Sequence, residues 1–204
     1  CFFTSFDFMN NCLKYWEVKK LLEEIEKFKE IFKDRRHNKI NLAKNFDNSF
    51  FDPKNKGGIL FSVLRGTSSE GIDFTDDRAR MVIIIGIPYP SIGELKVNLK
   101  MEYLNEKQNN QINHINGKVW YENCAFKTVN QALGRLIRHK NDFGTLVLID
   151  NRYDDPYIEN KFSKWFRNNI KYYTTNKILE DIKNFHSNFS LKSFTNSSSQ
   201  KIHE

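Results

Sequence analysis

Cysteine is scarce in this 204-residue chain, and its placement excludes two kinds of site. The three cysteines, Cys1, Cys12 and Cys124, form no CxxC pair and are odd in number. They therefore predict neither a disulfide framework nor a zinc site with paired ligands, and they favour a reducing compartment. The five histidines are scattered without an HExxH motif, so we expect no metal ligands among these residues.

Long apolar runs are also missing. No run approaches the roughly 20 residues of a membrane span, and no signal peptide is visible, so we expect no membrane partner. The chain opens on Cys1, Phe2 and Phe3 without a Met, a pattern typical of the end of a strand. We therefore expect the sequence to be a piece of a longer protein.

Acidic residues are outnumbered, with 25 Asp and Glu against 32 Lys and Arg and a formal net charge of +7. A polyanionic partner, most commonly nucleic acid, explains this charge, and so does a merely soluble basic surface. Hydrophobic residues make up 39% of the chain, which is enough for one core and a small appendage.

Short apolar runs alternate with helical patterns along the chain. Residues 59–64, 81–85 and 145–149 have the length and continuity of parallel strands buried on both faces, and Phe2 and Phe3 end another. Helical periodicity marks residues 8–32, 95–106 and 120–139. This alternation predicts an α/β domain over residues 1–173, with a doubly wound, mostly parallel sheet flanked by helices.

The remaining segments are polar. Residues 33–58 predict a surface loop or a loosely held helix, and residues 107–118 predict a flexible excursion. Residues 174–204 form a separate unit in which an amphipathic helix is followed, from Ser193, by a disordered polar tail. The apolar residues of that helix are Ile178, Ile182, Phe185 and Phe189.

The first group of candidate functional residues lies in a loop directly after residues 59–64. Its members are Gly66, Thr67, Ser68, Glu70, Gly71 and Asp73. The glycines permit close approach to the backbone, the hydroxyls suit phosphate oxygens, and the carboxylates can orient an arginine, a ribose hydroxyl or a water. Ile72 and Asp73 stand where a Walker A loop needs Lys and Ser or Thr, so this is not one. An ordinary strand-to-helix turn with a capping serine is the alternative.

The second group lies on the predicted helix at residues 120–139. Helical spacing places four polar side chains on one stripe, namely Lys127, Gln131, Arg135 and Arg138. The opposite stripe, Ala125, Val129, Leu133 and Leu136, is expected to pack on the sheet. Guanidinium groups suit phosphate recognition and phosphoryl transfer. A solvated basic face is the alternative, but Gly134 counts against it because a mid-helix glycine costs stability without apparent return.

Two weaker candidates have simpler explanations. Thr4 and Ser5 could hold a nucleic-acid phosphate, yet they could equally cap the following helix with Asp7, and the cap is the preferred interpretation. Trp120 and Tyr121 could stack on bases, but aromatic residues at helical spacing are more often core, and we interpret them so.

Together these residues resemble the carboxyl-terminal RecA-like lobe of the XPD family of superfamily 2 DNA helicases. Residues 65–74 are similar to motif V, residues 131–138 to motif VI and residues 2–6 to motif IV. Residues 99–104, with Trp120 and Tyr121, are most similar to the branch that contains the regulator of telomere elongation helicase and FANCJ.

The resemblance implies an ATP-driven 5′-to-3′ DNA helicase of the nucleus, in which ATP and Mg²⁺ lie between two RecA-like lobes. It implies that Gln131, Arg135 and Arg138 act on the ATP phosphates as catalytic groups. It also assigns Glu70, Gly71 and Asp73 to the ATP site. It further implies a set of residues that bind the backbone phosphates of single-stranded DNA or DNA junctions: Thr4, Ser5, Gly66, Thr67 and Ser68.

The family's Walker A loop, its Asp-Glu-Ala-His motif and its 4Fe–4S cysteines belong to the first lobe and are absent from this sequence. We therefore expect this chain alone to be inactive and its first partner to be that lobe. An RNA helicase lobe, or a non-catalytic RecA-like module that binds partners, is the alternative. Repair, transcription and telomere maintenance all stay open as pathways.

Overall fold

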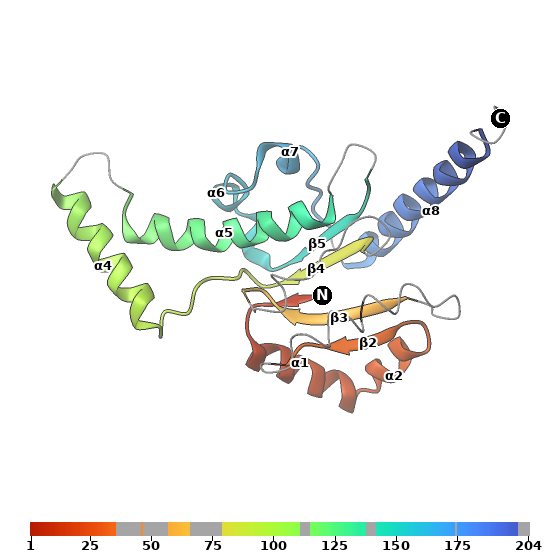
Figure 1. Cartoon of the computed structure of the whole chain (residues 1–204), viewed down its shortest axis with the longest axis horizontal. Coiled ribbons are helices and arrows are strands. Elements are labelled where there is room, and N and C mark those ends of the chain that lie inside the picture. The colour runs from red at the N-terminus through yellow and green to blue at the C-terminus, as the bar shows by residue number, and fades with distance from the viewer. Residues whose placement is uncertain are drawn as a thin grey trace.

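A parallel sheet of five strands forms the centre of the part that the structure describes (Figure 1). This computed structural model describes residues 1–35, 46, 57–65, 79–110, 115–137, 142–173 and 175–199. The strands are β1 (Phe2–Phe3), β2 (Glu30–Lys33), β3 (Gly58–Val63), β4 (Met81–Ile85) and β5 (Thr145–Ile149). Their order is β2-β3-β1-β4-β5, and each neighbouring pair is parallel. The predicted parallel α/β fold is confirmed.

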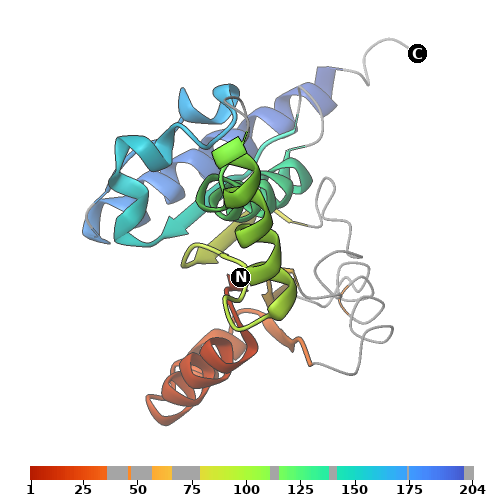
Figure 2. The same cartoon turned by 90° about the vertical axis from the view of Figure 1, so that its left-hand side faces the viewer.

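Helices cover both faces of the sheet (Figures 1 and 2). Helices α1 (Phe6–Val18) and α2 (Leu21–Glu26) lie on one face, and α5 (Gly117–Leu136) lies on the other. Helix α4 (Leu95–Asn110) contacts the amino-terminal end of α5, where Gly117 lies against Met101, and extends away from the sheet. After β5 come η2 (Asn151–Asp154), α6 (Pro156–Glu159), α7 (Lys164–Arg167) and α8 (Thr175–Ser199). None of the helices in these described stretches is both long and apolar enough to cross a bilayer.

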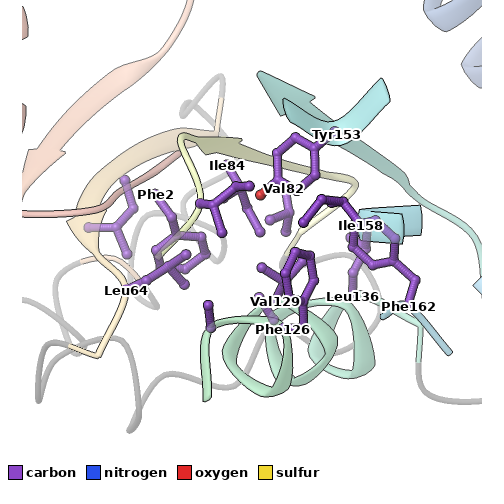
Figure 3. Packing of buried hydrophobic residues seen from close by; sticks show 14 of the residues in the cluster. Phe2, Leu64, Val82, Ile84, Phe126, Val129, Leu136, Tyr153, Ile158 and Phe162 are labelled. Atoms are coloured by element: carbon purple, nitrogen blue, oxygen red, sulfur yellow. The ribbon is translucent and has the colours of Figure 1, made fainter. Parts of the chain in front are cut away.

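The two faces of the sheet carry two hydrophobic clusters. Successive side chains of a strand point to opposite faces, and β1 shows this with two residues. Phe2 belongs to the cluster under α5, with Ile84 and Phe126 (Figure 3). Phe3 belongs to the cluster under α1, with Phe61. Each buried aromatic side chain contributes about 1.5–3 kcal/mol, so β1 ties both helical layers to the sheet although it is short.

Helix α5 follows the predicted pattern along most of its length. Ala125, Val129, Leu133 and Leu136 are all buried, which confirms the apolar stripe. The helix begins where Asn116 accepts a 2.8 Å hydrogen bond from the Val119 amide. It ends at Leu136 because the backbone of the next residue is extended, so the prediction of a helix to residue 139 is corrected.

Three other expectations are corrected. Residues 8–32 are not one helix, because a left-handed turn at Lys20 (φ 58) separates α1 from α2, and β2 follows. Residues 33–58 are not wholly a surface loop, since Asp34 and Phe46 are buried, although most of that segment lies outside the described residues. The predicted excursion at residues 107–118 begins inside α4 and ends inside α5.

The carboxyl-terminal helix runs further than predicted. Helix α8 continues to Ser199, beyond the apolar residues from which the helix was predicted. Adding residues to an existing helix is far cheaper than starting one, which allows a polar sequence to continue it. The helix docks through Phe189, whose ring stacks on Phe143 at 4.9 Å, and through His186, 3.0 Å from the Thr145 hydroxyl. Because Thr145 begins β5, α8 docks beside the amino-terminal end of that strand.

Candidate nucleic-acid groove and nucleotide-facing helix

A groove of about 1370 Å³ opens at the carboxyl ends of three strands. Thr4 follows β1, Arg65 follows β3 and Ile87 follows β4, and all three residues line the groove. The other wall is formed by α4 and the first half of α5. Strand β1 lies between β3 and β4, and the covering helix changes from α1 on one face to α5 on the other. Ligands of open α/β sheets bind at such switch points.

Thr4 and Ser5 supply hydroxyl groups to this groove. Ser5 is the N-cap of α1, where its Oγ accepts a 3.1 Å hydrogen bond from the Phe8 amide, so the predicted cap is confirmed. The Ser5 hydroxyl retains its proton for donation, because a hydroxyl both donates and accepts. Gly86 has φ +87, and an added Cβ there would lie 2.9 Å from Thr4 Cγ2. Glycine therefore lets the ends of β1 and β4 lie side by side.

Arg65 joins the end of β3 to α5. Its guanidinium donates a hydrogen bond to the backbone carbonyl of Cys124, which lies within α5. Its backbone is left-handed (φ 65), a conformation that non-glycine residues seldom adopt and that clusters at functional sites. The arginine is exposed in the groove and adds positive charge there.

A stacked tyrosine pair supports the floor of the groove. The rings of Tyr89 and Tyr121 lie 5.1 Å apart and nearly parallel, and Tyr121 donates a 2.9 Å hydrogen bond to the Pro90 carbonyl. Burial raises the pKa of both phenols above the usual value. Arg152 lies over Tyr89, and its hydrogen bonds to Asp150 hold the pKa of that carboxyl below its usual value.

The charge of the groove is mainly positive. Lys96 and Lys100 of α4 line it together with Arg65, against one acidic side chain, Glu94, among the described lining residues. Three cations and several hydroxyl groups around one groove suit a ligand with repeated phosphates. They provide no acidic cluster that would repel such a ligand.

The polar stripe of α5 continues the groove. Trp120 and Cys124 line the groove, and Lys127 and Gln131 follow them at helical spacing with exposed side chains. Gly134 is exposed as well, and a Cβ added there would meet no described atom within 4 Å. The described atoms therefore leave room for a side chain at Gly134, and the expected approach of a ligand or another backbone stays a prediction.

Several predicted site residues cannot be placed. Arg135 is in the last turn of α5, but its side chain lies outside the described residues, as does Arg138 altogether. The same holds for the whole loop after Arg65, which contains Gly66, Thr67, Ser68, Glu70, Gly71 and Asp73. Their roles stay predictions. Within the described ranges, no three His, Cys, Asp or Glu residues are grouped to hold a metal ion.

Sequence reasoning missed a buried polar pair at the end of β2. Asp34 is only 3% exposed, and its Oδ2 accepts a 2.7 Å hydrogen bond from Ser62 of β3. Its position in a polar segment suggested solvent, and a single polar residue carries no periodic signal. The pair fixes the carboxyl end of β2 beside that of β3.

It also missed the part of the groove formed by α4. Lys96 and Lys100 repeat at a spacing of four, as do Leu95, Leu99 and Tyr103, which is the only signal that the sequence offers. Trp120 was interpreted as core, but it belongs to neither buried cluster and lines the groove instead. Tyr121 is half-buried, as a supporting residue would be.

Comparison with known proteins gives consistent results. A family described as helicase C-terminal domain matches residues 1–169. A regulator of telomere elongation helicase 1 homolog from Aedes aegypti is 36% identical over 171 residues, which is 83% of this chain and 17% of that protein. Its Culex quinquefasciatus counterpart is 35% identical over 192 residues, 92% of this chain and 20% of that protein. The chain thus spans no more than about a fifth of these relatives.

One solved structure shares the fold. The structure of S. tokodaii Xpd4 aligns with a TM-score of 0.50 and 13% identity, over 80% of this chain and 28% of that one. Identity this low bears on the arrangement of helices and strands alone.

Proposed function

Because the chain belongs to the helicase C-terminal domain family and is a helicase motor lobe of the XPD type, we propose that it is the second lobe of an ATP-dependent 5′-to-3′ DNA helicase. In this proposal the lobe holds one side of a single DNA strand and one side of an ATP molecule. The other sides belong to a first RecA-like lobe, because this sequence has no Walker A loop.

The observation that carries the proposal is the groove at the carboxyl ends of β1, β3 and β4. Thr4 and Ser5 offer hydroxyl donors there, and Arg65, Lys96 and Lys100 offer positive charge. These groups recognise phosphate without reading bases, which suits a motor that moves along any sequence. Phosphate contacts alone do not distinguish DNA from RNA, and DNA is proposed because the relatives at 35–36% identity are homologs of a regulator of telomere elongation helicase.

The proposed nucleotide side is the exposed stripe of α5. Gln131 would orient the terminal phosphate or the attacking water, and Arg135 and Arg138 would neutralise charge as the lobes close. In this proposal Mg²⁺ is held by the first lobe, to which the resemblance assigns the Walker A loop and the Asp-Glu-Ala-His motif. The three cysteines cannot supply the four thiolates of a 4Fe–4S cluster, so that group would also belong outside this lobe.

Fluorescence anisotropy tests the strand side on the 204-residue chain. The probe is a fluorescein-labelled thymidine strand of about 15 nucleotides. The affinity is expected to fall steeply between about 50 and about 200 mM salt. Replacing Lys96 and Lys100 by Ala removes two phosphate contacts, so the salt slope is expected to fall by about 1.4, or roughly 0.7 per contact.

The matched control replaces Lys177 and Lys183 of α8 by Ala, which removes the same charge from exposed sites away from the groove. Equal losses in both double variants would show that only net charge matters and would contradict a defined strand site. The same preparation is expected to show no DNA-stimulated ATPase, and turnover above that of an Arg138→Ala control would refute the need for a first lobe.

A further inference from the structure

Helix α4 presents apolar side chains to the groove instead of burying them. Leu95, Leu99 and Tyr103 line the groove and are 72%, 55% and 47% exposed. They follow one another at a spacing of four, so they form one stripe. Val97 is buried and helps to attach the helix, while the stripe faces open space. Figure 2 views the molecule from the side on which α4 crosses in front of the sheet.

Positive charges surround the aromatic member of this stripe. The ammonium groups of Lys100 and Lys107 lie 5.2 and 5.0 Å from the centre of the Tyr103 ring. Trp120 of α5 lines the same groove, so the walls formed by α4 and α5 each bring an aromatic ring. Lys96 adds a further cation. An apolar stripe meant for a protein partner would not need this density of cations.

Flat rings interleaved with cations are the features by which proteins hold single-stranded nucleic acid. Bases stack on aromatic faces, and lysines accompany the backbone phosphates. The stripe is also continuous with Thr4, Ser5 and Arg65, where the proposed function places those phosphates. Charge, ring chemistry and continuity therefore favour one occupant, a single strand of nucleic acid.

We propose that the groove face of α4 and α5 is a base-stacking platform, in which Tyr103 and Trp120 contact the bases while Lys96 and Lys100 contact the phosphates. This inference rests on the proposed function and adds to it that the lobe holds the bases as well as the backbone. Stacking accepts every base, so the platform adds affinity without sequence preference.

Two labelled strands of equal length separate stacking from phosphate binding. One is a thymidine strand, and the other is an abasic strand with the same phosphates. Tyr103→Ala is expected to weaken binding of the thymidine strand about fivefold or more, and that of the abasic strand by less than about twofold. Tyr103→Phe keeps the ring and is expected to match the unmodified chain on both strands.

Tyr15 provides the matched control. It is an exposed tyrosine on α1 with the Lys19 ammonium 5.7 Å from its ring centre, and it does not line the groove. Tyr15→Ala is expected to change neither affinity. An equal loss on both strands for Tyr103→Ala, or no loss on the thymidine strand, would overturn the platform.

Tryptophan fluorescence gives a second readout. The thymidine strand is expected to quench the intrinsic fluorescence and the abasic strand is not, because only a stacked base lies against the indole. Trp120→Phe is expected to abolish the quench although Trp16 and Trp165 remain. A quench that persists in Trp120→Phe would contradict the assignment of that residue.

The outcomes distinguish the platform from the proposed function. If the unmodified chain binds neither strand, both fail. If it binds both strands with salt-dependent affinity and Tyr103→Ala changes nothing, the phosphate groove stands and the platform is overturned. Unchanged strand affinity together with impaired ATPase in a two-lobe enzyme would instead assign the α4 stripe to protein docking, which also overturns it.

Discussion

Replacing Gly134 by Ala is expected to stabilise the lobe and to impair the enzyme. Gly134 lies within α5, is exposed, and has no described atom within 4 Å of an added Cβ. The substitution therefore brings no clash, and the difference in helix propensity decides its effect. Alanine is favoured over glycine by up to about 1 kcal/mol inside a helix, and we expect about 0.5 kcal/mol here because the helix ends at Leu136.

For a chain of this size, a gain of about 0.5 kcal/mol corresponds to a rise of about 1–2 °C in the melting temperature. Circular dichroism of the 204-residue chain measures it. Gly144→Ala is the contrasting variant, because its Cβ would lie 2.7 Å from the buried Leu136 side chain. Overpacking of this kind costs about 1–3 kcal/mol, so its melting temperature is expected to fall.

The DNA-stimulated ATPase activity of Gly134→Ala is expected to fall although its stability rises. If Gly134 faces the nucleotide or the first lobe, the added methyl group occupies space that closure requires. A misfit of about 1–3 kcal/mol lowers DNA-stimulated kcat/KM about 5- to 150-fold in a two-lobe enzyme. Since the variant is more stable, misfolding cannot explain the loss. Unchanged turnover in Gly134→Ala would refute the reasoning that places the α5 stripe at the ATP site.

Three further substitutions test other parts of the lobe. Arg138→Ala in a two-lobe enzyme is expected to lower ATPase turnover about a thousandfold while the melting temperature and strand affinity persist; turnover within a few-fold of the parent would contradict a catalytic role. Ser62→Ala removes the hydrogen bond to the buried Asp34 carboxylate and is expected to lower the free energy of unfolding by about 1.5–3 kcal/mol in urea titrations, and an unchanged midpoint would show that the pair is dispensable. Burial, and next the charge of Arg80, lower the pKa of His186, so the unfolded chain binds the proton more readily and stability falls as pH drops below about 6.5. The melting temperature is therefore expected to fall between about pH 7.5 and about pH 5.5, and His186→Asn is expected to flatten that fall; an identical pH profile in the variant would count against the histidine.

The strands that the sequence predicted are those with continuous apolar runs. Residues 81–85 and 145–149 became β4 and β5 with the predicted bounds because burial on both faces leaves a strong local pattern. Strand β2 was missed because Ile31 and Phe32 continue the helical spacing of the preceding segment, and four residues cannot establish a period of two. The left-handed turn at Lys20 is formed without glycine, so no residue type marked the break.

The sequence predicted the parts of the site whose residues are close together in the chain. It did not predict the parts in which folding brings distant segments together. Ser5 is recognisable because a cap is local, and the buried and exposed stripes of α5 follow from helical spacing. The α4 wall could not be derived, since its contribution depends on how α4 packs against the amino-terminal end of α5 beside the groove. No local pattern distinguishes Tyr103 in such a wall from a tyrosine on any exposed helix, as the similar setting of Tyr15 demonstrates.

Arg65 connects the two sides of the proposed motor through its hydrogen bond to α5. Its left-handed backbone costs about 1–2 kcal/mol, and its exposed hydrogen bond to the Cys124 carbonyl returns about 1.5 kcal/mol. The hydrogen bond to α5 thus offsets much of the backbone strain. Cys124 lies on the same stripe of α5 as Gln131, which the proposed function places at the nucleotide. Arg65 therefore joins the end of β3, where the proposed function places the strand, to the helix that it places at the nucleotide.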